Sequence, residues 1–97
     1  MSSPAPSTPV QLNELEQRFE LSAEGLTAVL EFVPDGDRVA FTHTYVPPEW
    51  RGGGVASTLA HAALREARRR GWRVVPQCSY VALFLTRHPE YSDLVTP

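Results

Sequence analysis

The sequence has no lysine, a single cysteine and no long apolar run, and these absences narrow the classes of protein that fit. Cys78 cannot form a disulfide within the chain, as is typical of proteins from reducing compartments. No apolar segment approaches the ~20 residues of a membrane-spanning helix. Residues 1–9 have neither the basic start nor the apolar core of a secretory signal. We therefore expect a cytoplasmic protein that does not insert into a membrane.

The length of 97 residues suits one hydrophobic core and is too short for two. Residues 1–12 open with a stretch rich in serine and proline, a composition typical of disorder. We expect a disordered tail there and a single folded domain over residues 13–97. No spacing among the three histidines and Cys78 resembles a closed metal site, so we expect no bound metal.

Alternating and helical apolar periods predict an α/β domain with a mixed sheet. Three antiparallel strands come first, and Val39, Phe41, His43 and Tyr45 are expected on one face of the third. An apolar stripe over residues 56–70 predicts a long helix capped by Gly71, and a parallel strand follows it. A short helix that Ser79 could cap ends before Pro89. The expected strands cover residues 15–21, 26–32, 38–46 and 72–77.

A glycine-rich turn at residues 51–56, Arg-Gly-Gly-Gly-Val-Ala, lies between the third predicted strand and the long helix. Glycine lets backbone N–H groups converge on a ligand, and the helix start adds unpaired N–H groups and partial positive charge. Such a turn is suited to a phosphate or diphosphate. No Lys-Ser or Lys-Thr follows it and the spacing G-x-G-x-x-G is absent, which excludes a P-loop and a Rossmann site.

The arrangement R-x-x-G-x-A, filled by Arg51, Gly54 and Ala56, resembles the acetyl-CoA diphosphate loop of the GNAT N-acetyltransferases. His-Thr-Tyr-Val-Pro before it (43–47) and Pro-Gln-Cys-Ser-Tyr-Val after it (76–81) strengthen the resemblance. Over Arg18 to Val95 the chain looks like the minimal, single-domain GNAT-like family. The resemblance implies acetyl transfer from acetyl-CoA to an amine, with a protein, polyamine or small amine as the unidentified acceptor.

The resemblance also implies site residues, because in this superfamily pantetheine lies between two diverging strands near the loop. Cys78 could accept the acetyl group, donate a proton to the departing thiolate, only contact the cofactor, or be no more than a small buried apolar residue at a strand end. His43 could take a proton from the amine or be a hydrogen-bonded core histidine, and Tyr80 is a second candidate acid. The expected cofactor contacts are Thr44, Tyr45, Val46, Arg51, Gly52, Gly53, Gly54, Val55, Ala56, Ser57, Cys78 and Ser79.

Two other functions fit parts of the sequence. The chain could bind CoA or an acyl-CoA without turnover, since fold and function can separate. An arginine cluster at residues 65–73 could hold the 3′-phosphate of CoA or a nucleic acid, or could simply complement the helix C-terminus. The acidic isoelectric point near 5.9 argues against nucleic acid. His61 and His88 are each expected to be a surface or capping residue, with His61 on the solvent side of the long helix.

Overall fold

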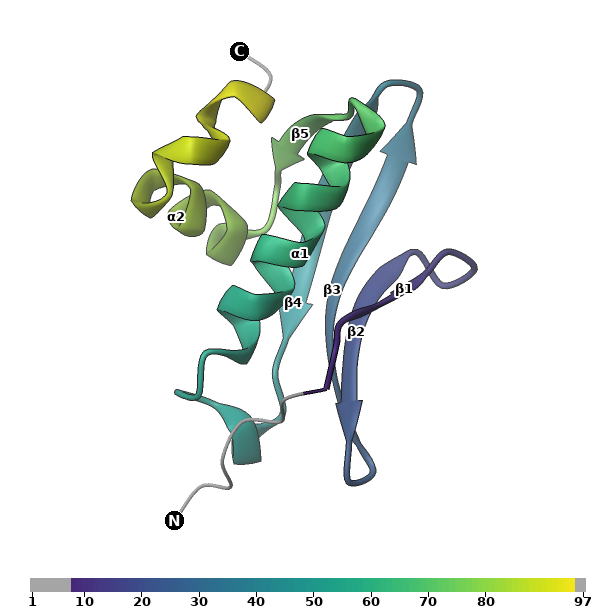
Figure 1. The fold of residues 1–97 in the computed structure, drawn as a ribbon, viewed down its shortest axis with the longest axis vertical. Coiled ribbons are helices and arrows are strands. Elements are labelled where there is room, and N and C mark those ends of the chain that lie inside the picture. The colour runs from purple at the N-terminus through teal and green to yellow at the C-terminus, as the bar shows by residue number, and fades with distance from the viewer. Residues whose placement is uncertain (1–7, 96–97) are drawn as a thin grey trace.

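The computed structural model describes residues 8–95 and shows a five-stranded sheet with one long helix packed across it (Figure 1). This confirms the predicted α/β architecture with a mixed sheet, a long helix and a short C-terminal helix. Its strands are β1 (Gln11–Asn13), β2 (Arg18–Ala23), β3 (Leu26–Asp35), β4 (Arg38–Tyr45) and β5 (Arg73–Pro76). Its helices are α1 (Val55–Arg70), α2 (Ser79–Arg87) and the 3-10 helices η1 (Pro48–Trp50) and η2 (Pro89–Leu94).

The strands follow one another in chain order across the sheet, β1-β2-β3-β4-β5. Neighbours are antiparallel except β4 and β5, which are parallel because α1 carries the chain back along the sheet. The sequence did not reveal β1, and the expected domain start at residue 13 falls inside it, since Gln11 and Leu12 pair with β2. The first seven residues of the expected tail lie outside the described residues. Leu15, predicted in a strand, is 96% exposed in the turn after β1.

A bulge in β4 changes which side chains face α1. Phe41 lies opposite Phe32, but His43 lies opposite Glu31, so two steps along β4 match one step along β3. Phe41 is buried on the α1 side, whereas after the extra residue it is Thr44, opposite the buried Leu30, that faces that side. The prediction that His43 and Tyr45 share a face with Phe41 is therefore wrong, because the alternation slips by one residue at the bulge.

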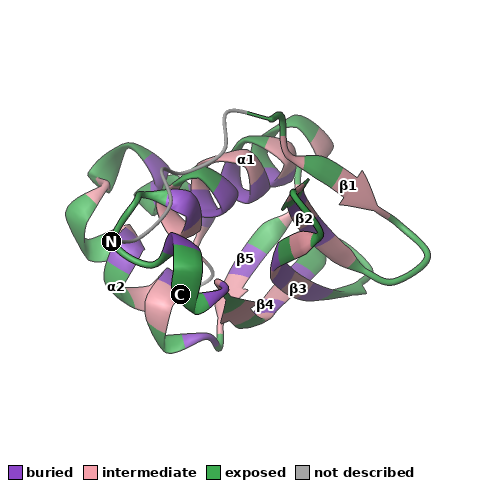
Figure 2. Ribbon diagram, turned by 90° about the horizontal axis from the view of Figure 1, so that it is seen from below, coloured by how far each residue is buried: buried purple, intermediate pink, exposed green. Residues whose placement is uncertain are grey.

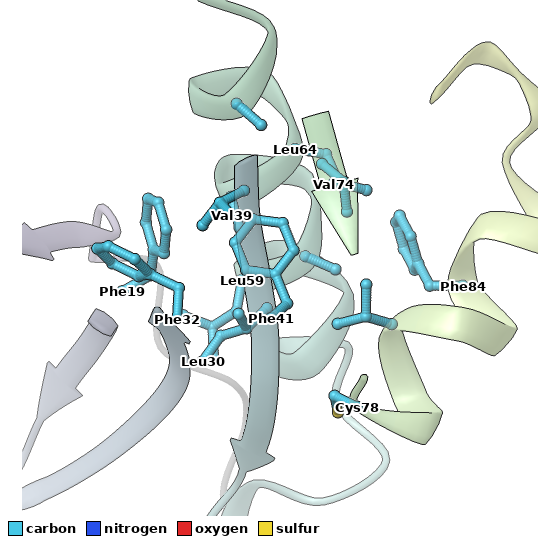
Figure 3. Close-up of a cluster of buried hydrophobic side chains, with 14 of the residues drawn as sticks. Phe19, Leu30, Phe32, Val39, Phe41, Leu59, Leu64, Val74, Cys78 and Phe84 are labelled. Atoms are coloured by element: carbon cyan, nitrogen blue, oxygen red, sulfur yellow. The ribbon is translucent and has the colours of Figure 1, made fainter. Parts of the chain in front are cut away.

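The core lies between α1 and the sheet, where α1 presents an apolar stripe that includes Leu59 and Leu64 (Figure 3). Both leucines are fully buried, and removing such a side chain from water contributes roughly 1.5–3 kcal/mol. Gly71 ends the helix as predicted, in the left-handed conformation at φ 73°, with its N–H directed at the Ala67 and Arg68 carbonyls. The packing fixes α1 across the sheet and thereby fixes the position of its N-terminus.

The two faces of the sheet are covered differently (Figure 2). α1 covers one face, α2 and η2 lie beside β5, and no described helix covers the other face of β3 and β4. We call this second face the outer face. No helix among residues 8–95 is long and apolar enough to span a membrane.

His61 does not lie on the solvent side of α1 as predicted. It is partly buried between α1 and the C-terminal helices, with Nδ1 3.0 Å from the Tyr91 hydroxyl and its ring edge against Phe84. His88 stacks on the same Phe84 ring at 3.9 Å between centroids. Burial, with the neighbouring His88, lowers the pKa of His61. Both histidines therefore belong to the packing that joins α2 and η2 to α1.

Candidate functional site

The parallel strands β4 and β5 separate at one end of the sheet. Their pairing stops at Phe41 and Pro76, and the Cys78 N–H then donates to the Phe41 carbonyl at 2.8 Å. β4 continues to Tyr45 with no strand on its β5 side among the described residues. The main-chain groups on that edge of β4 are thus available to a ligand. In open α/β sheets such a divergence beyond the carboxyl ends of parallel strands is where ligands bind.

The glycine loop is attached to the end of β4 by Arg51. Its Nε donates to the Val46 carbonyl at 2.9 Å, and its guanidinium carbon lies 5.9 Å from the centroid of the Tyr45 ring. The main chain turns sharply as well, because the Gly53 N–H donates to the Trp50 carbonyl. The Arg51 side chain therefore holds the loop against the end of β4.

The N-terminus of α1 offers a set of main-chain donors. Gly54 precedes the helix in the left-handed conformation at φ 85°, which L-residues with a Cβ rarely adopt. The first backbone bond of the helix runs from Thr58 N–H to the Gly54 carbonyl, so the four amides of residues 54–57 have no backbone acceptor among residues 8–95. Unpaired amides at the positive end of a 16-residue helix form an anion site.

A cavity of about 290 Å³ opens where the loop, α1 and α2 meet. It is lined by Val46, Trp50, Arg51, Gly52, Gly54, Val55, Ala56, Ser57 and Tyr80. Apart from Trp50, each of these was predicted as a site residue. Trp50 is 2% exposed. Its position as a large aromatic residue directly before the glycine loop is the feature of the sequence that could have identified it as a cavity residue. Gly53, Thr44, Tyr45, Cys78 and Ser79 do not line the cavity.

Thr44 and Cys78 meet beside the divergence of the strands. The Thr44 hydroxyl lies 3.3 Å from the Cys78 sulfur, and the bulge brings it there by turning Thr44 to the α1 side. Cys78 is 9% exposed at the edge of the core (Figure 3). It occupies the residue before α2, and Ser79 is the first helical residue. The expectation that Ser79 caps α2 is wrong, since that position belongs to Cys78.

Tyr80 extends from the first turn of α2 into the wall of the cavity. Partial burial raises the pKa of its phenol, and Arg87 opposes this only in part. A phenol of ordinary pKa is already protonated at neutral pH, and the upward shift leaves it so. Tyr80 therefore presents a protonated hydroxyl next to the loop.

His43 lies away from these groups. It is exposed on the outer face opposite Glu31, so it is not a core histidine. The structure brings Thr44, Cys78 and Tyr80 to the α1 side of the divergence and leaves His43 on the other side of the sheet.

Three of the five arginines in the cluster form ion pairs at the opposite end of α1. Arg69 and Arg70 bind Glu66, with Arg70 also bound to Glu14, and Arg68 binds Asp93. Hydrogen bonds from Arg69, then Arg70, lower the pKa of Glu66 to about 2. Thirteen residues of helix separate Arg68 from the loop, about 20 Å. These three arginines therefore tie α1 to the β1–β2 turn and to η2. These contacts support the structural interpretation of the arginines rather than a phosphate site.

The geometry is that of a small ligand site with an anion-binding loop. No group of three or more His, Cys, Asp or Glu side chains within residues 8–95 is placed to hold a metal ion. A sequence model of the GCN5-related N-acetyl-transferase family matches residues 18–94, which is most of the chain and includes β2 to η2. The chain therefore belongs to the GCN5-related N-acetyltransferase family.

Proposed function

We propose that this protein transfers the acetyl group of acetyl-CoA to a primary amine. The observation that carries the proposal is the cavity at the N-terminus of α1. It combines the glycine loop with amides that have no backbone acceptor, next to the place where β4 and β5 diverge. Family membership supports acetyl transfer in general, and these residues suggest how this chain would perform it.

The loop fits a diphosphate both in shape and in charge. Gly52 and Gly54 line the cavity with φ near 85°, and a Cβ at either position would point into space free of protein atoms within 4 Å. The first residues of α1 line the same cavity, so the oxygens of a diphosphate could approach their amides closely. The edge of β4 at residues 44–46, which has no β5 partner, would hold the pantetheine arm and its thioester carbonyl.

When bound, acetyl-CoA supplies an activated acyl group and a thiolate that can leave. His43, on the outer face, would take the proton from the acceptor's ammonium group so that the neutral amine can attack. Tyr80, on the α1 side and protonated at neutral pH, would give its phenolic proton to the departing thiolate. The acid and the base then lie on opposite sides of the sheet divergence, which suits an amine that enters from one face and a thiol that leaves toward the other.

Cys78 has a positioning role in this scheme, with direct transfer to the amine. Its thiol is paired with the Thr44 hydroxyl beside the strand edge, and its main-chain N–H fixes the start of α2 to Phe41. Through α2 this anchors Tyr80 in the wall of the cavity.

The test is acetyl transfer and thiol release with acetyl-CoA and a panel of primary amines, for wild type and Cys78→Ala. We expect amine-dependent release of CoA thiol by both proteins, with the variant reduced because it loses the contact between the Cys78 thiol and the Thr44 hydroxyl. Complete loss of turnover in a folded Cys78→Ala variant that still binds acetyl-CoA would favour a cysteine nucleophile over direct transfer. Tight binding without turnover in either protein would show a CoA-binding module instead. Absence of acetyl-CoA binding by calorimetry would refute the proposal altogether.

A further inference from the structure

The outer face of the sheet contains a second cavity, to which the proposed function assigns no role. Its volume is about 320 Å³, near the lower end of the roughly 300–1,000 Å³ that small-molecule sites occupy. We call it the outer trough. It is lined by Val33, Asp35, Arg38, Ala40, Thr42, Val75 and Gln77, from β3, β4 and the end of β5.

The floor of the outer trough is apolar and follows directly from the register. Val33 lies opposite Ala40, and Ala40 lies opposite Val75, so one small side chain is flanked by two valines on neighbouring strands. The missing bulk at Ala40 makes the depression. Val33 is 51% exposed, so its side chain is open to a ligand.

One end of the outer trough carries two opposite charges. Asp35 and Arg38 face each other across β3 and β4 at the hairpin end, yet they form no ion pair within 4 Å in the described part of the chain. A ligand head with both an ammonium and a carboxylate group complements this pair, with the ammonium on Asp35 and a bidentate carboxylate contact on Arg38.

The other end of the outer trough meets the divergence of β4 and β5. Thr42 follows Phe41, the last residue of β4 that pairs with β5, and Gln77 follows Pro76, the last residue of β5 that pairs with β4. Thr42 lies four positions after Arg38, about 13 Å along a strand. Side chains at both ends occupy part of that length, so the ligand that fits has an aliphatic stem of a few methylene groups.

We propose that the outer trough is the acceptor site and that it takes a free α,ω-diamino acid, of the lysine or ornithine type. The zwitterionic head binds Asp35 and Arg38, the stem lies on Ala40, and the terminal amine reaches the divergence. This inference rests on the proposed function, because the terminal amine is placed where the acyl group would lie. His43 follows Thr42 on the same face, where it can accept the proton that the terminal ammonium loses.

Titration of ¹⁵N-labelled protein with L-lysine, followed by NMR, tests the site without any turnover. We expect amide shifts confined to the strands that line the outer trough, and at least tenfold weaker binding for Arg38→Gln, which loses a charge-assisted contact. 1,5-Diaminopentane, which has the stem and both amines but no carboxylate, should bind at least tenfold more weakly than lysine. Absence of shifts on these strands, or equal binding of the diamine, would overturn the proposal.

Two further variants separate this inference from the proposed function. Ala40→Leu fills the floor of the outer trough, and Ser22→Leu adds the same bulk to the exposed face of β2 outside it. Ala40→Leu should raise the KM for lysine at least tenfold and leave the KM for acetyl-CoA unchanged, while Ser22→Leu changes neither. An Ala40→Leu variant that still turns over, with a KM for lysine equal to that of wild type, would refute the acceptor site alone. A lysine complex in a protein that binds no acetyl-CoA would refute the proposed function and leave the diamino acid site standing.

Discussion

Replacing Gly54 with alanine tests whether the start of α1 holds the diphosphate. Gly54 and Gly71 bracket the same helix, both in the left-handed conformation, at φ 85° and 73°. An alanine Cβ meets no protein atom within 4 Å at either position. Forcing an L-residue into this conformation costs roughly 1–2 kcal/mol. Each variant should therefore lose a similar amount of stability, about 5–15 °C in Tm for a domain of this size.

The two variants should differ in cofactor binding. The Gly54 methyl group would enter the space above the unpaired amides, and losing one charge-assisted hydrogen bond costs about 1.5–3 kcal/mol, or roughly 10- to 100-fold in Kd. Gly71 lies at the far end of α1, so Gly71→Ala should bind acetyl-CoA as wild type does. Isothermal calorimetry gives the Kd values, and thermal unfolding gives the Tm values. Equal losses of affinity in both variants, or wild-type affinity in a folded Gly54→Ala, would refute the reasoning.

Three further predictions concern the cavity wall, the loop and pH. Tyr80→Phe should lower kcat by about 100-fold or more with little change in the KM for acetyl-CoA, because it removes only the proton donor; an unchanged kcat in a thiol-release assay would rule out this role. Arg51→Met should raise the Kd for acetyl-CoA severalfold while costing at most about 1 kcal/mol of stability, since it frees the loop from Val46; calorimetry checks this against the exposed control Arg87→Met, which should bind normally. The pKa of Glu66 is lowered from 4.5 to about 2 in the folded protein. The ionised carboxylate therefore stabilises the fold above pH 4.5, and this contribution is lost as the pH falls toward 2. Because Arg69 is exposed, solvent screening reduces the contribution to about 1–2 kcal/mol. Urea unfolding of Glu66→Gln should therefore show a deficit against wild type at pH 7 that shrinks by pH 3, and a constant deficit would contradict the assignment.

The sequence alone determined the features that depend on near neighbours. The glycines at 52–54, the apolar stripe of α1 and Gly71 predict a loop, a helix and its cap from the local geometry of the chain. The alternation of β2 and β3 predicts their hairpin for the same reason. These local elements, together with the motifs around them, were sufficient to indicate the family.

Only the tertiary structure decided which side chains meet. The bulge that puts Thr44 beside Cys78 and His43 on the outer face depends on the pairing of β4 with β3, which no local period records. The row of Val33, Ala40 and Val75 likewise exists only once three strands are in register. A strand's own sequence specifies how its side chains alternate. Contacts between residues far apart in the chain decide which of the two sets faces the core and which charged side chains find no partner.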